Sequence, residues 1–172
     1  MAGAGKSEVA RLFERKGFAR IRFGDVTDDE VRKRGLELNE ENERSVRELL
    51  RREHGMAAYA RLNLPRIETA LETSNVVIDG LYSWEEYIFL KDHFGEDMCL
   101  VTVWSSPATR YARLDRRRKR PLTPDEAAGR DRAEIEKLNK GGPIAIADFL
   151  VINESGLGDL ARQTEQVMSE LR

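Results

Sequence analysis

The sequence predicts an α/β fold with a doubly wound parallel sheet, because short apolar runs alternate with segments of helical spacing. The strand-like runs are at residues 18–23, 75–79, 98–104 and 149–153. Two of them, around Val76-Val77-Ile78 and Leu100-Val101-Thr102-Val103, are β-branched and almost unbroken, as is typical of parallel strands covered on both faces. A length of 172 residues suits a single domain.

The N-terminal segment contains the second half of a phosphate-binding loop, G-x-x-x-x-G-K-[ST]. Its candidate phosphate-binding residues are Gly3, Ala4, Gly5, Lys6 and Ser7. In this motif a glycine-rich turn aims backbone N–H groups at phosphate, and the helix behind it adds the partial positive charge of its N-terminus. We expect Lys6 to reach the β- and γ-phosphates and Ser7 to bind Mg²⁺.

A helix directly after the loop agrees with this interpretation. Val9, Leu12 and Phe13 share one helical face, and Gly17 suits the position just past the helix end. The first motif glycine and the strand that launches the loop would precede Met1, so we expect an upstream segment that this chain lacks. A plain glycine turn before a capped helix is the alternative.

Asp79 ends the apolar run at 75–79 and is followed by Gly80. Ligands of α/β sheets lie at the carboxyl ends of the strands, so Asp79 is expected close to the loop. There it would hold Mg²⁺ with Ser7 or orient the attacking oxygen. The structural alternative is a turn-forming aspartate before a glycine.

Two helical segments stand outside the strand rhythm. Residues 28–73 are interpreted as a helical acceptor-binding insertion, with a packing hairpin as the alternative. Residues 115–142 are interpreted as a lid: Thr123 and Glu126 form a capping box, and the following helix carries Arg130 and Arg132 as candidate catalytic residues.

The segment from Arg110 to Arg120 holds seven Arg or Lys residues and one Asp. A phosphate clamp is the favoured interpretation, because cations over a triphosphate stabilise the charge that shifts during transfer. A nucleic-acid patch and a solvated helix face remain alternatives.

Composition excludes several classes of protein. The 29 basic and 31 acidic residues give a net charge of −2, which favours neither DNA nor an anionic membrane as a partner. Cys99 is the only cysteine, so the chain has no internal disulfide framework. With no signal peptide and no apolar stretch of about 18 residues, a cytoplasmic location is expected. His54 and His93 have no companions at zinc-ligand spacing.

Taken together, these motifs resemble the P-loop small-molecule kinases around adenylate kinase and dephospho-CoA kinase, most closely an uncharacterised archaeal-type group related to both. The segments that carry the resemblance are Gly3 to Ser7, Gly24-Asp25, Asp79-Gly80, 106–114, 130–132 and 147–154.

The resemblance implies a five-stranded parallel sheet, ATP and Mg²⁺ as cosubstrate, and transfer of the γ-phosphoryl group to a small acceptor. It implies that Arg113 stacks on adenine, that Arg117 reaches phosphate, and that Asn153 lines the adenine pocket. Arg130 and Arg132 match the lid arginines, and Asp25 belongs to the acceptor side.

The sequence departs from adenylate kinases where these bind the acceptor phosphate, because Asp28, Tyr82 and Ser83 stand where arginines are expected. Arg32 or Arg34 would have to substitute. The absent first strand lies mid-sheet in this fold, so neighbouring strand edges would be left unpaired.

The expected function is an ATP-dependent phosphotransferase for a nucleotide-like acceptor, of the nucleoside monophosphate or dephospho-CoA type. A nucleotide-binding regulatory NTPase without an acceptor is the alternative. The identity of the acceptor and the oligomeric state stay open.

Overall fold

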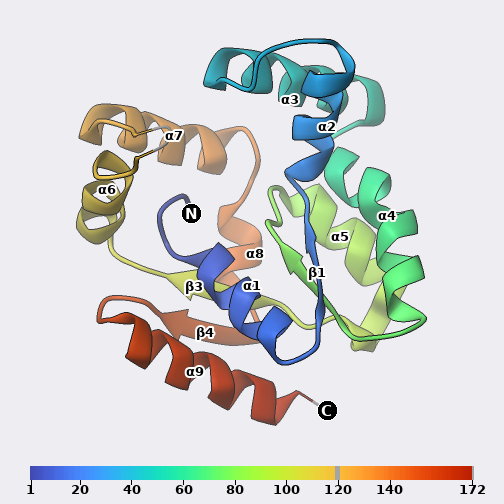
Figure 1. Cartoon of the computed structure of the whole chain (residues 1–172), viewed down its shortest axis with the longest axis vertical. Coiled ribbons are helices and arrows are strands. Elements are labelled where there is room, and N and C mark those ends of the chain that lie inside the picture. The colour runs from blue at the N-terminus through green and yellow to red at the C-terminus, as the bar shows by residue number, and fades with distance from the viewer. Residues whose placement is uncertain (119–120, 172) are drawn as a thin grey trace.

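The computed structural model describes residues 1–118 and 121–171, in which two pairs of parallel strands pack against helices (Figure 1). β1 (Ala19–Arg22) pairs with β2 (Val76–Asp79), and β3 (Val101–Trp104) pairs with β4 (Phe149–Ile152). All four predicted strand segments are confirmed, and so is the α/β class with parallel strands.

The sheet is divided. Within the described residues β2 pairs only with β1 and β3 only with β4, so the facing edges of β2 and β3 have no ladder partner. This agrees with the expectation of unpaired strand edges. The five-stranded sheet implied by the resemblance is not formed by these residues, because only four strands are present.

Helices account for most of the remaining chain. They are α1 (Lys6–Arg15), α2 (Asp25–Lys33), α3 (Glu40–His54), α4 (Ala58–Leu71), α5 (Trp84–Phe94), the 3₁₀ turn η1 (Gly95–Asp97), α6 (Pro107–Asp115), α7 (Pro124–Glu136), α8 (Gly141–Ala145) and α9 (Leu157–Glu170). Within the described ranges, none of these helices is long and apolar enough to cross a membrane.

Local capping explains where several helices begin. The Asn39 side chain accepts a hydrogen bond from the Asn42 N–H at 2.9 Å at the start of α3. Ser106 caps α6 before Pro107, and Thr123 forms the predicted capping box with Glu126 at the start of α7. These three starts were readable from the sequence.

Two apolar cores flank helix α1. One lies around β1 and β2 and includes Phe23, Val31 and Tyr59, while the other lies around β3 and β4 and includes Phe13 and Val151. α1 contacts both strand pairs and also α9. The helix that begins at the N-terminal loop therefore connects the two halves of the domain.

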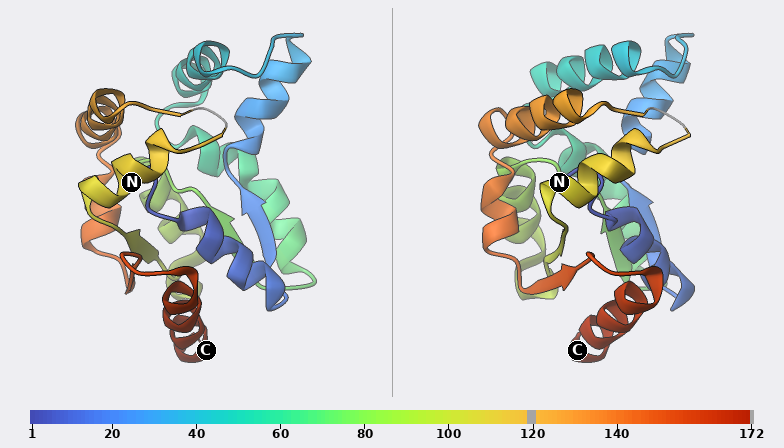
Figure 2. Two further views of the ribbon diagram at one scale, coloured as in Figure 1. Left: turned by 60° about the vertical axis from the view of Figure 1, so that its left-hand side comes forward. Right: turned by 90° about the vertical axis from the view of Figure 1, so that its left-hand side faces the viewer.

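The N-terminal loop lies between two groups of helices (Figures 1 and 2). α6 and α7 lie on one side, and α2 and α3, which begin the predicted insertion, lie on the other. The roles of acceptor-binding insertion (28–73) and lid (115–142) stay predictions. Lys119 and Arg120 of the basic segment lie outside the described residues.

Glu86, in the first turn of α5, is fully buried beneath the turn that follows β2. Its Oε2 accepts a hydrogen bond from the Tyr82 N–H at 2.7 Å, whereas its buried Oε1 has no partner among the described residues. Burial raises the pKa of Glu86 to about 7, although the Tyr82 N–H and the charge of Arg51 favour the ionised form. This acid holds the backbone of Tyr82 in place.

We expect Glu86→Gln to gain stability relative to the native chain between pH 5 and pH 8. The raised pKa means that the folded state retains a proton which the unfolded chain releases above its ordinary value of 4.5, so native stability falls as the pH rises to about 7. The melting temperatures of the variant and the native chain at pH 5 and pH 8 measure this gain. We expect it to be on the order of 1–3 kcal/mol in the free energy of unfolding. Glu96→Gln, whose side chain is fully exposed, is the control and should show no such change. Parallel pH profiles for Glu86→Gln and the native chain would refute the raised pKa.

Candidate functional site

The N-terminal loop turns sharply into α1. Gly5, the N-cap residue, has a φ of 103°, and a Cβ at this position would collide with the side-chain amide of Asn153. Ala4 is buried, and its carbonyl accepts a hydrogen bond from Asn153 Nδ2 at 2.9 Å. The first N–H groups of α1 have no intrahelical acceptor, so this end of the helix suits an anion.

Arg110 fixes the loop to the rest of the domain. Its guanidinium donates to the Ala2 carbonyl at 3.2 Å and to the Ser105 carbonyl at 3.1 Å. It also forms a two-pronged pair with Asp131 of α7, at 2.9 and 2.6 Å, and both side chains are almost fully buried. One arginine thus joins the loop, the end of β3 and the predicted lid. The sequence interpretation counted Arg110 only as part of a basic run.

Lys140, which is buried, and Lys6, which is partly buried, both lie near the carboxylate of Glu134. Lys6 Nζ donates to the Met1 carbonyl at 2.8 Å, and Lys140 Nζ pairs with Glu134 at 2.7 Å. Burial and then the charge of Lys140 lower the pKa of Lys6 to about 8. Burial opposes the ionisation of Glu134, but Lys140 lowers its pKa to about 2. The excess positive charge calls for an anion here.

Sequence reasoning missed Lys140. The residue precedes Gly141-Gly142 at the start of α8, and a single lysine before two glycines carries no motif. Its burial becomes visible only when the chain between α7 and α8 is folded against Tyr82, whose ring centroid lies 5.5 Å from Lys140 Nζ.

The predicted nucleotide-binding arginines separate into two groups. Arg113 donates to Ser105 Oγ at 3.0 Å and to the Asn153 carbonyl at 2.9 Å, so Arg113 and Asn153 lie together behind the loop. Arg130 donates to Glu134 at 3.3 Å, and burial together with the charge of Arg130 lowers the pKa of Arg117. Arg113 and Asn153 support the loop, whereas Arg117 and Arg130 belong to its cationic surroundings.

Arg132 is exposed and has no hydrogen bond or ion pair with the loop residues in the part of the chain that the structure describes. Asp131, between Arg130 and Arg132, faces inward to Arg110. Side chains two positions apart on a helix do not face each other, so Arg130 and Arg132 leave α7 in different directions, and their common role as lid arginines stays a prediction.

Asp79 lies beside Ser7, as the topology predicted. The Ser7 hydroxyl donates to Asp79 Oδ1 at 3.1 Å, and Arg20 pairs with Asp79 Oδ2. No group of three or more His, Cys, Asp or Glu suited to a metal occurs in the described ranges. Mg²⁺ keeps several waters and phosphate oxygens, so two adjacent hard oxygen donors are enough to fit it here.

The acceptor side holds the expected Asp25, whereas the roles of Arg32 and Arg34 there stay predictions. Arg32 and Arg34 are exposed and pair with acids of their own helix, Arg32 with Asp29 at 3.0 Å and Arg34 with Glu30 at 2.7 Å. The arginine that does lie at the strand ends is Arg22, which the sequence interpretation did not select. It donates to Asp25 at 2.7 Å and to Asp28 at 2.9 Å.

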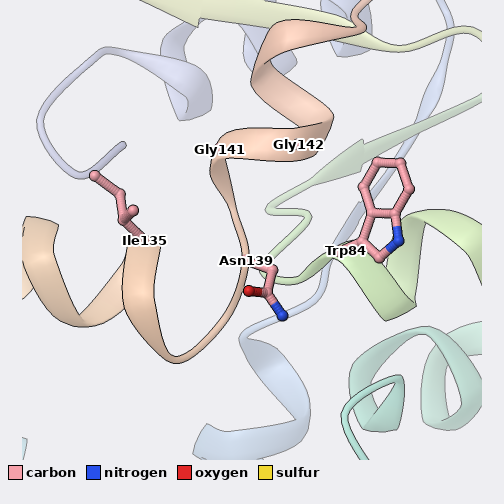
Figure 3. Close-up of a pocket in the computed structure, with 5 residues that line it drawn as sticks. All are labelled: Trp84, Ile135, Asn139, Gly141 and Gly142. Carbon is pink, nitrogen blue, oxygen red and sulfur yellow. The ribbon is translucent and has the colours of Figure 1, made fainter.

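An open pocket of about 380 Å³ borders the segment that carries Lys140. Its lining residues are Trp84, Ile135, Asn139, Gly141 and Gly142 (Figure 3). Trp84 projects from the start of α5, and its ring packs so closely on Gly142 that a Cβ there would lie 2.6 Å from it. This lining contains no charged side chain, so the pocket is separate in character from the cationic loop.

Comparison with known proteins agrees with this geometry. A family model described as an AAA domain matches residues 1–154. The chain is 35% identical to a UPF0200 protein of Thermococcus sibiricus, over 99% of this chain and 92% of the relative. It is 34% identical to a UPF0200 protein of Methanocaldococcus jannaschii, over 99% of this chain and 87% of the relative.

A solved structure is also similar. The crystal structure of TT1252 from Thermus thermophilus has a TM-score of 0.63 and 21% identity, covering 99% of this chain and 94% of that chain. At this identity the likeness concerns the fold alone.

We expect Asp131→Asn to destabilise the domain by about 3–5 kcal/mol, because it leaves the buried Arg110 charge without its carboxylate. Denaturant unfolding measures the loss. Asp115→Asn, in an exposed position at the end of α6, is the matched control and should change stability by less than about 0.5 kcal/mol. Equal effects of the two substitutions would contradict the central role of the Arg110 pair.

Proposed function

The chain belongs to the UPF0200 family and carries its P-loop domain of AAA type, and we propose that it is an ATP-dependent phosphotransferase acting on a nucleotide-like small molecule. In this proposal it is a kinase of the adenylate kinase or dephospho-CoA kinase kind. Membership of the family supports nucleotide binding, and the arrangement around the loop supports transfer.

The observation that carries the proposal is the pair Lys6 and Lys140 beside the loop. Lys140 is buried and Lys6 is partly buried, and the carboxylate of Glu134 acts on both, with Asp79 as a further acid near Lys6. Arg130 adds a third cation next to Glu134. Burying unbalanced positive charge is unfavourable unless an anion completes the site, and a triphosphate at the N-terminus of α1 supplies that anion.

The remaining residues divide into holding and orienting groups. Ser7 and Asp79 would hold Mg²⁺, which neutralises phosphate charge when it is bound. Gly3, Ala4 and Gly5 provide the backbone that faces the phosphates, while Arg113 and Asn153 keep this backbone in place. Arg117 and Arg130 come from the α6–α7 side, where a small movement would bring them over the transferred group.

A regulatory NTPase is the second candidate, and one observation favours it. Arg32 and Arg34 do not reach the strand ends, and Asp28 neutralises Arg22 instead of adding to its charge. An acceptor site of this kind lacks free charge for a phosphate. A kinase releases ADP faster when its acceptor is present, whereas a switch hydrolyses ATP slowly with or without one.

We expect Lys6→Ala to abolish Mg-ATP binding and Lys140→Met to weaken it by about tenfold or more, since each charge-assisted hydrogen bond contributes roughly 1.5–3 kcal/mol. Isothermal titration with a non-hydrolysable ATP analogue measures both effects. Lys16→Met is the control, because Lys16 is exposed, follows the C-terminal end of α1 away from the loop, and pairs with Glu165. Unchanged affinity in Lys6→Ala would refute the phosphate-binding loop.

We expect ADP release from Mg-ATP to rise at least about tenfold, equivalent to 1.4 kcal/mol of barrier, when the correct acceptor is added. The panel contains nucleosides, nucleoside monophosphates and dephospho-CoA. Slow ADP release that no acceptor stimulates would favour the regulatory NTPase.

A further inference from the structure

We propose that the acceptor is held at the ends of β1 and β2 through an uncharged, hydroxyl-bearing group such as a ribose, and that Asp25 and Asp28 exclude a monophosphate from this place. The inference rests on the proposed function and names the class of its second substrate. It concerns the "acceptor cluster", defined as Arg22, Asp25, Asp28, Arg66 and Tyr82.

The acceptor cluster lies next to the reacting end of the phosphate site. Arg22 is the last residue of β1 and pairs in register with Asp79, the last residue of β2. The place that a Cβ of Gly24 would take lies 3.2 Å from both Arg22 Nη2 and the Tyr82 hydroxyl, so these two donors converge. A group bound by these donors would lie near the end of β1, which is in register with Asp79, and Asp79 accepts from Ser7 of the phosphate-binding loop.

The charges of the acceptor cluster cancel. Arg22 Nη1 donates to Asp25 at 2.7 Å and to Asp28 at 2.9 Å, and Arg66 lies 3.9 Å from the second oxygen of Asp25. Two arginines therefore face two carboxylates. A doubly charged phosphate placed here would meet both carboxylates at close range and would have to break the hydrogen bonds that hold Arg22.

The N-terminal loop has the opposite character. Lys6, Lys140 and Arg130 surround one buried carboxylate there. The molecule thus separates a cationic end, which suits a polyphosphate, from a neutral end, which suits uncharged polar groups.

Hydrogen-bonding groups remain available at the neutral end. The Tyr82 hydroxyl and Arg22 Nη2 make no hydrogen bond within residues 1–118 and 121–171, and a sugar hydroxyl can accept from both. Tyr82 is itself held firmly: its backbone N–H bonds to Glu86, its ring packs edge-on against Tyr59 at 5.3 Å, and its hydroxyl lies on Gly80. Rigid donors of this kind position a ligand without supplying charge.

The transfer step balances with such an acceptor. The acceptor hydroxyl oxygen forms a bond to the γ-phosphorus of ATP, and the bond from that phosphorus to the oxygen bridging the β-phosphorus breaks. ADP leaves with the electron pair of the broken bond. The hydroxyl proton is released to water.

The test compares matched ligands on the full chain. Adenosine, guanosine, cytidine and uridine are each titrated beside their 5′-monophosphates, with Mg²⁺ and a saturating non-hydrolysable ATP analogue present. We expect at least one nucleoside to bind about tenfold or more tightly than its monophosphate. Equal or tighter binding of the monophosphates, or no binding of any nucleoside, overturns the proposal.

Charge removal gives the second arm. In the double variant with Asp25→Asn and Asp28→Asn, the amide oxygens can still accept from Arg22, so the preference against the monophosphate should fall at least about tenfold. Asp29→Asn is the matched control, since Asp29 lies on the same helix and is mostly exposed. An unchanged preference in the double variant overturns the exclusion by Asp25 and Asp28.

Binding of the ATP analogue tests the proposed function separately from the character of the acceptor cluster. If the ATP analogue does not bind, the phosphotransferase proposal is lost, and the same nucleoside and monophosphate titrations on the chain without analogue still decide the character of the acceptor cluster.

Discussion

Arg110 donates from one buried guanidinium to the Ala2 and Ser105 carbonyls and to both oxygens of Asp131. Every donor in this set meets a partner, so the charge is tolerated inside the domain. Because the partners belong to the N-terminal loop, the end of β3 and α7, the position of each depends on the others. The phosphate-binding surface is therefore a property of this pair as much as of the glycine motif.

Around the loop, too, a single acid is shared by several cations. Glu134 is the acid shared by Lys140 and Arg130, and it lies close enough to influence Lys6. At the strand ends, by contrast, Asp25 and Asp28 balance Arg22 and Arg66. The charged side chains thus favour an anion at the loop, whereas they balance one another at the strand ends.

Much of the fold could be predicted because its signals are local. The strand runs, the Asn39 and Ser106 caps and the Thr123 capping box all depend on neighbouring residues, and all of them are present in the structure. The pairing of Ser7 with Asp79 also followed from topology, since parallel strands end at one edge.

The rest depends on contacts distant in sequence. Arg110 and Asp131 are 21 positions apart, and neither carries a pattern that marks it as buried. Lys140 becomes a site residue only through the fold of the chain before α8. Arg32 and Arg34 were chosen by sequence position near Asp25, but helical geometry directs them to Asp29 and Glu30 instead. Spacing along a helix decides which neighbours an arginine contacts, and the role of Arg32 and Arg34 at the acceptor stays a prediction.

Helix α1 contacts both strand pairs, while no ladder hydrogen bond joins β2 to β3 in the described residues. The two halves are therefore held together by packing on α1, whose N-terminus is the phosphate-binding loop, and by the contact of α5 with α8. Packing of this kind slides more readily than a hydrogen-bonded ladder. A polyphosphate bound at the N-terminus of α1 would touch a helix that contacts both strand pairs, so we expect its binding to stiffen the contact between the two halves.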